Sequence, residues 1–315
     1  MFINPGRSTL VGVDAGSTEI KVAAVRATRG TSFAVLGTGS GVTPAGLMER
    51  GQIADPQRLG AAIKEVLQQA RIRQRRAALV VPSSLGFVRR LTFPPMPLKE
   101  LRASIDLQPD RFIPFAHEGA VYDVYPLPCP PEATEQAVVV GAAPRKVVES
   151  LMAAARSAGI TPVRVDLEPL ALFRAALATG QASPQTALAI VDLGASAAKI
   201  SLFEEGVPIV SRVVDMPAFQ NEQRAEGTDE LFWDIRRSLE FALTQVALPL
   251  TRVLITGGVG GDDYLALSLT AYLRGFLANR LPGDFRVEPL RDPDERVASS
   301  HMVALGLSLP PELFT

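Results

Sequence analysis

The sequence predicts an α/β protein built from two similar halves, and a repeated hairpin is the main reason. The first copy runs from Val11 to Ala23 around Asp14-Ala15-Gly16-Ser17-Thr18, and the second from Leu188 to Ser201 around Asp192-Leu193-Gly194-Ala195-Ser196. In both, one apolar strand enters the turn and another leaves it, and we expect each glycine to adopt a positive φ there. Strands and amphipathic helices then alternate after each hairpin. This order predicts two half-domains whose hairpins meet at a shared cleft.

The two turns carry the chemistry of a phosphate-binding cleft. Each combines one carboxylate, Asp14 or Asp192, with backbone N–H groups and hydroxyls that lie close together in the sequence. Amides and hydroxyls bind phosphate oxygens, while an aspartate binds Mg²⁺ through water. The pair therefore favours a Mg-nucleotide as the ligand. The alternative is that both aspartates are ordinary turn residues, because Asp is common at hairpin ends.

Composition favours a folded cytoplasmic protein. With 315 residues the chain is long enough to form two hydrophobic cores. Lys plus Arg (32) nearly balance Asp plus Glu (33), so no overall charge favours nucleic acid or an anionic membrane. The single cysteine, Cys129, excludes an intramolecular disulfide framework. We expect no signal peptide and no membrane span, since no apolar run approaches about 20 residues, and therefore membrane association only through partners.

Local signals place several elements between and after the hairpins. Asp55-Pro56 predicts the start of a helix that runs to Ala70, with the aspartate as N-cap. The run Gly37-Thr38-Gly39-Ser40-Gly41 lacks the Lys-Ser/Thr of a phosphate-binding loop, and we interpret it as a plain loop. From residue 87 to 162 the pattern strand, helix, strand, strand, helix indicates a small inserted unit with its own core. Residues 218–227 are polar and predict a loop.

A set of longer motifs points to a known family. They are Phe112-Ile113-Pro114-Phe115, Tyr122-Asp123, Ala143-Pro144-Arg145, Gly159-Ile160, Val165-Asp166-Leu167-Glu168-Pro169-Leu170, Arg236-Arg237-Ser238-Leu239-Glu240-Phe241 and Ile255-Thr256-Gly257-Gly258. The order hairpin, connecting helix, hairpin and strand-Gly-Gly is similar to the nucleotide sites of the actin, heat-shock chaperone and sugar kinase superfamily. Within it, the inserted unit resembles that of the PilM family of type IV pilus assembly proteins. The resemblance to this family covers nearly the whole chain. The division protein FtsA and the secretion protein GspL share the resemblance more loosely.

The resemblance implies an actin-like fold, that is, a duplicated ribonuclease H-like fold with an inserted subdomain of the FtsA and PilM type. Residues 215–229 are too few for the two helices that relatives place there, at about 1.5 Å of rise per residue, which implies that the outer subdomain of the second half is largely deleted. The implied division is 1–86 for the first half of domain I, 87–162 for the insertion, 163–184 for the return to domain I and the connecting helix, 185–300 for domain II, and 301–315 for a C-terminal helix and tail.

The resemblance also implies an ATP and Mg²⁺ site between the hairpins. Asp14 and Asp192 would hold Mg²⁺ through water from opposite sides. Glu168 would orient an attacking water, with Asp192 as the second catalytic residue. The residues implied to bind the nucleotide are Asp14, Gly16, Ser17, Thr18 and Lys21 at the first hairpin, Gly194, Ala195 and Ser196 at the second, and Gly257 and Gly258 beside the nucleoside.

The reduced outer subdomain removes one wall of that nucleoside site. The sequence therefore favours a pseudo-ATPase scaffold, or at most a weak ATPase.

Two of the implied roles also have a structural alternative. Lys21 lies within a strand and can equally point outward, and Glu168 can equally complement the N-terminus of the helix that follows it.

The function implied by the resemblance is that of a cytoplasmic adaptor in type IV pilus assembly. It would bind the cytoplasmic N-terminal tail of the inner-membrane protein PilN as an extended segment, in a groove between the first domain and the insertion. Other inner-membrane or motor components of the pilus are further implied partners. Two alternatives stay open: an active ATPase or small-molecule kinase of the same superfamily, and a GspL-like cytoplasmic domain of a type II secretion system.

Overall fold

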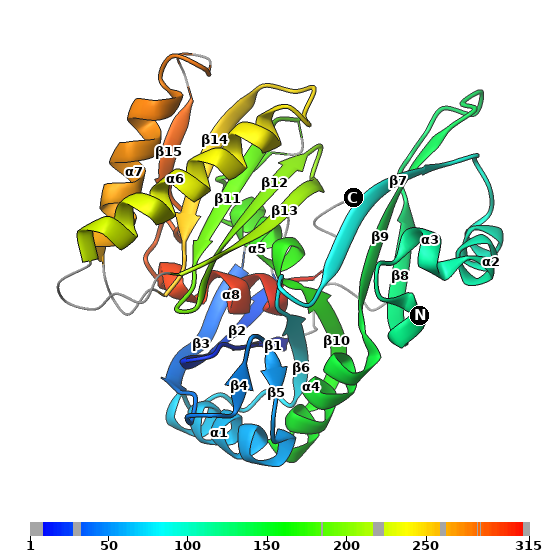
Figure 1. Cartoon of the computed structure of the whole chain (residues 1–315). Coiled ribbons are helices and arrows are strands. Elements are labelled where there is room, and N and C mark those ends of the chain that lie inside the picture. The colour runs from blue at the N-terminus through cyan, green and yellow to red at the C-terminus, as the bar shows by residue number, and fades with distance from the viewer. Residues whose placement is uncertain are drawn as a thin grey trace.

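The two hairpins begin two five-stranded sheets that share one strand order (Figure 1). The structure, a computed structural model, describes residues 9–27, 33–183, 185–216, 224–258, 263–281, 283 and 285–310. The order is β3-β2-β1-β6-β10 in the first sheet and β13-β12-β11-β14-β15 in the second. In each sheet an antiparallel meander of three strands is followed by two strands parallel to the first. The described chain thus holds two copies of one topology, as the repeated hairpin predicted.

The main elements of the two halves correspond one to one. The first sheet contains β1 (Leu10–Ala15), β2 (Glu19–Ala27), β3 (Phe33–Val42), β6 (Arg76–Val81) and β10 (Thr161–Leu167). The second contains β11 (Ala187–Leu193), β12 (Ala197–Glu204), β13 (Val207–Asp215), β14 (Leu250–Thr256) and β15 (Arg286–Pro289). The helices are α1 (Pro56–Gln69) and α4 (Arg145–Ser157) on the first sheet, α6 (Arg224–Leu243) and α7 (Asp263–Leu277) on the second, and α5 (Glu168–Ala178) and α8 (Met302–Ser308) between them (Figure 1).

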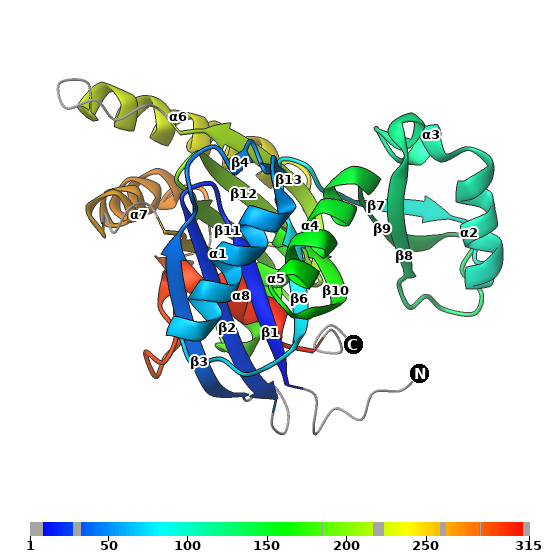
Figure 2. The same cartoon turned by 90° about the horizontal axis from the view of Figure 1, so that it is seen from below.

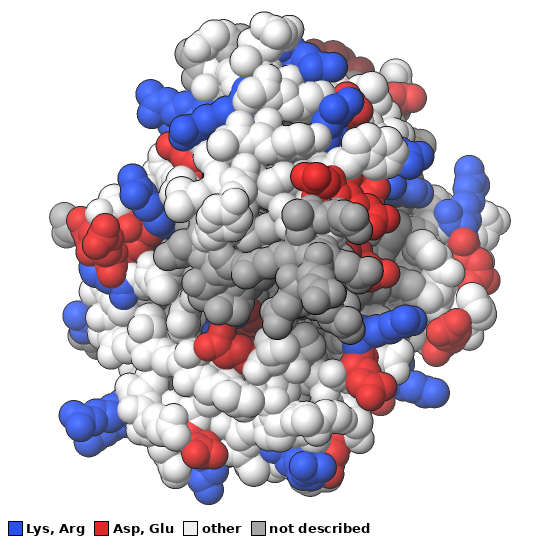
Figure 3. Space-filling model, turned by 60° about the vertical axis from the view of Figure 1, so that its left-hand side comes forward, with Lys and Arg blue, Asp and Glu red and all other residues white. Residues whose placement is uncertain are grey.

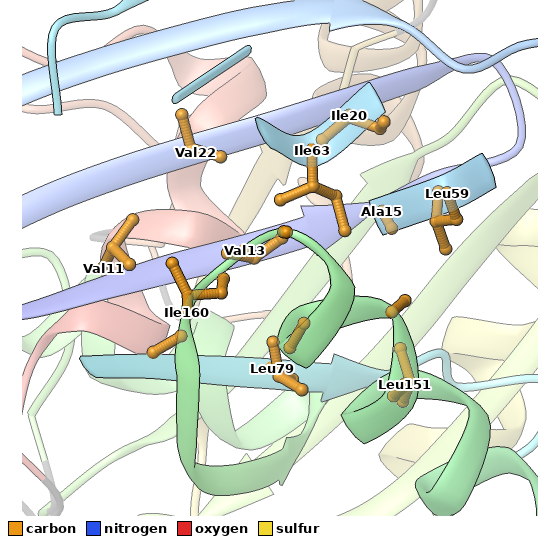
Figure 4. Packing of buried hydrophobic residues seen from close by; sticks show 14 of the residues in the cluster. Val11, Val13, Ala15, Ile20, Val22, Leu59, Ile63, Leu79, Leu151 and Ile160 are labelled. Carbon is orange, nitrogen blue, oxygen red and sulfur yellow. The ribbon is translucent and has the colours of Figure 1, made fainter. Parts of the chain in front are cut away.

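Helix α1 begins where the sequence predicted. The carboxylate of Asp55 accepts hydrogen bonds from the backbone N–H groups of Gln57 and Arg58, both at 3.0 Å. An N-cap of this kind contributes about 0.5–2 kcal/mol to helix stability. One turn further, Leu59 and Ile63 pack against the apolar side chains of β1 and β2 (Figure 4). A short ribbon of β4 (Met48–Glu49) and β5 (Gln52–Ile53) precedes the helix.

Helix α8 lies between β1 and α5 in backbone contact with both. A Cβ added at Gly12 of β1 would lie 2.0 Å from the carbonyl oxygen of Ala304. A Cβ added at Gly306 would lie 1.7 Å from the carbonyl oxygen of Ala171 in α5. Only glycine allows a backbone to approach this closely. The position of α8 between the two halves therefore depends on these two residues.

Two arginines hold the C-terminal end of α8. Arg164 Nη2 donates to the carbonyl of Leu309 at 2.8 Å, and Arg174 Nε donates to that of Gly306 at 2.9 Å. Both guanidinium groups also form ion pairs with Asp166. Positive charge is favourable at a helix C-terminus, where the carbonyl groups lack intrahelical partners. Asp166 of the Val-Asp-Leu-Glu-Pro motif therefore has a structural role.

The inserted unit stands apart from the two sheets (Figure 2). Its sheet has the order β7-β9-β8, and it contains β7 (Phe87–Phe93), α2 (Leu98–Leu107), α3 (Pro109–Phe112), the 3-10 turn Ala116–Glu118, β8 (Ala120–Pro126) and β9 (Gln136–Pro144). Its apolar side chains form a separate cluster. The predicted unit ran to residue 162, but α4 packs its buried face on α1 and the first sheet. We therefore propose that the insertion ends near Pro144.

The interpretation of the glycine run at 37–41 as a loop is wrong. β3 continues through it to Val42 and pairs with β2 along its length. A Cβ at Gly39 would lie 2.5 Å from the Cβ of Ala70, and one at Gly41 would lie 2.6 Å from Val66 Cγ2. Glycine at alternate positions thus lets α1 pack closely on this strand.

The segment between β13 and α6 is short, as the sequence indicated. β13 ends at Asp215 and α6 begins at Arg224, so the loop predicted for 218–227 is wrong at its C-terminal end. The rest of that loop, residues 218–223, lies outside the described residues, as does the tail 311–315. No helix pair fits between β13 and α6, which agrees with a reduced outer subdomain.

Surface charge follows the balanced composition. The face shown in Figure 3 carries Lys and Arg interspersed with Asp and Glu, in keeping with a net charge of −1. Among the described residues, no helix is long and apolar enough to span a membrane.

Candidate functional site

The two hairpin turns have the same geometry, but their glycines do not adopt the predicted positive φ. Gly16 N–H donates to the carbonyl of Glu19 at 2.9 Å, and Gly194 N–H donates to that of Ala197 at 3.0 Å. A Cβ at either glycine would lie 2.9 Å from that same carbonyl oxygen. Glycine is therefore required by the close approach of a carbonyl group, and for the same reason in both copies.

The tips of the two turns face each other. Ser17 Oγ donates to Ser196 Oγ at 3.4 Å, which brings the two halves of the cleft into contact. Thr18 lies at the first tip, where its carbonyl accepts from Thr43 N–H at 2.9 Å. Within the described ranges, the tip amides of residues 17 and 18, and of Ala195 and Ser196, have no protein acceptor. These amides are available to an anion in the cleft.

Glu168 and Asp192 share one half-buried cation, Lys199. Lys199 Nζ contacts Glu168 Oε1 and lies 3.2 Å from Asp192 Oδ2. The second oxygen of Glu168 accepts from both the N–H and the hydroxyl of Ser83, each at 2.8 Å. Both carboxylates are buried, at 4% and 5% exposure. The two predicted catalytic residues thus come together, and an ammonium group occupies the position between them.

The charges of this trio are fixed by their contacts. Burial would raise the pKa of Glu168, but Lys199 and the hydrogen bonds from Ser83 hold it below its usual range. Burial raises the pKa of Asp192, and Lys199 only partly opposes this. Burial would lower the pKa of Lys199, but Glu168 and Asp192 together raise it above its ordinary value. Lys199 therefore stays charged at every physiological pH.

Asp14 differs from Asp192 although it occupies the same hairpin position. Within the described ranges its carboxylate has no hydrogen bond and no ion pair. Burial raises the pKa of Asp14 from 3.8 to about 7, and the nearby charge of Glu168 adds to the effect. Lys21 lies opposite Asp14 in the hairpin register but pairs with Glu19 at 3.3 Å. Asp14 is thus a carboxyl group without a fixed partner in the cleft.

The glycines after β14 pack against both hairpins. Gly257 has φ +119°, and a Cβ there would lie 2.2 Å from the carbonyl oxygen of Leu193. A Cβ at Gly258 would lie 2.4 Å from Lys21 Nζ, so Lys21 points into the cleft and not outward. The structure thus brings Asp14, Lys21, Gly257 and Gly258 to one place with the second hairpin.

A second candidate site is a groove of about 740 Å³ between the insertion and the two halves. Its walls come from β8, β9, β10, α5 and the turn before β13. Val121 and Tyr125 of β8 line it and are 38% and 49% exposed. The charged groups at its edges are paired within the protein, Asp123 with Arg102 and Asp166 with Arg174. The groove therefore offers mainly apolar surface to a ligand.

Two strand edges border this groove. β8 is the terminal strand of the inserted sheet, and β10 is the terminal strand of the first sheet. A terminal strand leaves backbone N–H and C=O groups unpaired along one side. Both strands contribute lining residues along much of their length. The groove can therefore accept an extended chain by strand pairing at either edge.

Comparison with known proteins places the chain in a family. The family described as "Type IV pilus assembly protein PilM" matches residues 12–223. The chain belongs to the PilM family. A solved structure described as the "PilM-PilN type IV pilus biogenesis complex" is 26% identical, with a TM-score of 0.79 over 97% of this chain and 99% of that one.

Two more distant structures share the fold of this PilM-family chain. The ethanolamine utilization protein EutJ from Carboxydothermus hydrogenoformans is 14% identical, with a TM-score of 0.54 over 98% of this chain and 92% of that one. MreB5 of Spiroplasma citri, bound to ADP, is 12% identical, with a TM-score of 0.52 over 96% of this chain and 95% of that one. The fold is therefore actin-like, as the sequence predicted.

Sequence reasoning missed Lys199 and Ser83 in this PilM-family cleft. Lys199 follows Asp192 in the pattern Asp-x-Gly-x-Ser/Thr-x-x-Lys, which the first hairpin repeats from Asp14 to Lys21 with Thr18 at the hydroxyl position. Both lysines lie directly opposite their aspartates in the strand register. Comparing the two hairpins beyond the turn would have found Lys199. Ser83 has no such signal, because its contact with Glu168 joins segments far apart in the sequence.

The carboxylates predicted to hold Mg²⁺ do not form a donor set suited to it. Magnesium requires oxygen ligands, carboxylate or water, around a compact cation. Lys199 already places an ammonium group against Asp192 and Glu168. Of the three cleft carboxylates in the described chain, only Asp14 is without a cation partner. In the same part of the chain, no group of three or more His, Cys, Asp or Glu residues is arranged to hold a metal.

Proposed function

We propose that this chain is a cytoplasmic actin-like adaptor of type IV pilus assembly that binds the N-terminal tail of a PilN-like inner-membrane protein. The observation that carries the proposal is the apolar groove bordered by the free edges of β8 and β10. The similar solved structure is a PilM-PilN complex, which supports PilN as the partner. The chain would reach the inner membrane through PilN and contact other pilus components there.

The tail would bind as an extended strand. Main-chain hydrogen bonds to one terminal strand would supply affinity, and alternate side chains would enter the apolar groove. The exposed face of β8 presents Val121, Asp123 and Tyr125 at alternate positions. Because Asp123 is paired with Arg102, the neighbouring valine and tyrosine supply the apolar contacts. The specificity of the site would therefore rest on apolar side chains in the tail.

Replacing Val121 with arginine tests the groove directly. We expect Val121→Arg to weaken binding of a peptide with the PilN N-terminal sequence by about tenfold or more, because it places a charged side chain in apolar surface. Isothermal titration calorimetry with the full chain measures the effect. The matched control is Leu107→Arg, since Leu107 lies on α2 of the same insertion, is 82% exposed and does not line the groove. Equal affinity of both variants, or no binding by the wild type, would refute the proposed site.

We also propose that a nucleotide binds between the hairpins and tunes closure of the two halves. The free amides of both turn tips and the two lysines support an anionic ligand there. Glu168 uses both oxygens on Lys199 and Ser83, so we assign it to positioning Lys199 and not to orienting water. The cleft is therefore that of a nucleotide-binding scaffold, with at most weak ATPase activity.

A further inference from the structure

We infer that the cleft binds the phosphates of a nucleoside triphosphate without a divalent metal, with Lys199 and Lys21 as the counter-cations. This inference rests on the nucleotide part of the proposed function and specifies its chemistry. It follows from the contacts of Lys199, from the cost of displacing it, and from the placement of the second lysine.

Lys199 takes the place that a cation would have between the carboxylates. Its ammonium group contacts Glu168 and Asp192, and its side chain is only 19% exposed. Asp192 and Lys199 are directly opposed in the β11–β12 register, so the lysine cannot leave without disturbing a cross-strand pair.

Displacing Lys199 would also leave two buried carboxylates without a cation. Removing one partner of a buried ion pair is strongly destabilising, because the remaining charge has lost its water. Glu168 could not turn away, since Ser83 holds its other oxygen with two hydrogen bonds. The arrangement therefore resists replacement of the lysine by a hydrated metal, which keeps its own waters firmly.

The same hairpin position supplies the second cation. Lys21 lies opposite Asp14 in the β1–β2 register, and a Cβ added at Gly258 would lie 2.4 Å from its Nζ. The turn tips with free amides belong to the same two hairpins and meet at the contact between Ser17 and Ser196. Two ammonium groups and a set of backbone N–H groups neutralise and orient phosphate oxygens as fixed charges and dipoles. The phosphates thus have partners on both hairpins.

Calorimetric titration of the full chain with ATP, in EDTA and in millimolar MgCl₂, tests the inference. We expect wild-type affinities within about threefold of each other in the two buffers. Lys199→Met should weaken binding in EDTA by about tenfold, with MgCl₂ restoring it at least partly. Lys199→Arg keeps the charge and should stay independent of Mg²⁺. Lys21→Met is the matched control from the other hairpin, and should weaken binding equally in both buffers.

A second measurement uses the metal alone. Electron paramagnetic resonance of Mn²⁺ added to nucleotide-free protein should show no bound ion in the wild type and a bound ion in Lys199→Met. Tighter ATP binding by the wild type in MgCl₂, by about tenfold, would overturn the inference, as would wild-type Mn²⁺ binding or no ATP binding in either buffer. Binding of the PilN peptide in the same preparation separates this result from the adaptor proposal, because loss of one leaves the other standing.

Discussion

Gly306→Ala is expected to destabilise the protein by about 3 kcal/mol or more, which is at the upper end of overpacking effects. The new Cβ would lie 1.7 Å from the carbonyl oxygen of Ala171, and the next contact is with the carbonyl carbon of the same residue. Backbone atoms cannot move aside as a flexible side chain does. Either α8 or α5 would have to shift by more than 1 Å in a close-packed interior, at about that cost.

Urea unfolding monitored by circular dichroism measures this change. Gly275→Ala is the matched control, because Gly275 lies in helix α7 with nothing within 4 Å of an added Cβ. There the alanine should stabilise the protein by up to about 1 kcal/mol, since it is the better helix former. Similar midpoints for Gly306→Ala and the wild type would mean that α8 is not in backbone contact with α5.

Asp14→Asn is expected to raise the free energy of unfolding at pH 8 by about 2 to 4 kcal/mol. Burial raises the pKa of Asp14 from 3.8 to about 7, so between these values the unfolded chain has lost the proton that the folded chain keeps. Raising the pH through this window therefore favours unfolding of the wild type. Asparagine has no proton to lose, so the gain should be smallest near pH 4 and grow up to pH 7.

Denaturant titrations at pH 4, 6 and 8 follow that difference. Asp192→Asn is the matched control at the same position of the second hairpin. Burial raises the pKa of Asp192 as well, but this variant also loses the contact with Lys199 at 3.2 Å, so the loss of that ion pair should offset the gain at high pH. A pH-independent difference between Asp14→Asn and the wild type would contradict a raised pKa for Asp14.

Particular residues show how far sequence patterns reach. The hairpins and the N-cap at Asp55 could be predicted because each depends on residues close together in the chain. The glycine run at 37–41 was misread as a loop because its reason is the approach of α1, which no local signal shows. The expected positive φ of Gly16 and Gly194 was wrong for a related reason. A nearby carbonyl group, and not the φ angle, excludes a side chain there.

By itself, the sequence determined the repeated hairpin and the two aspartates of the cleft, because alternation and turn chemistry are written in consecutive residues, while the actin-like fold was implied by the resemblance to a known family. The tertiary structure decided what those aspartates do. Glu168 and Asp192 meet at Lys199 only because α5 and the second hairpin pack together, and that contact gives the two equivalent aspartates different partners. The groove likewise exists only because the insertion brings the β8 edge to the edge of β10. Charge pairing and strand edges depend on distances between distant segments, which a linear pattern does not contain.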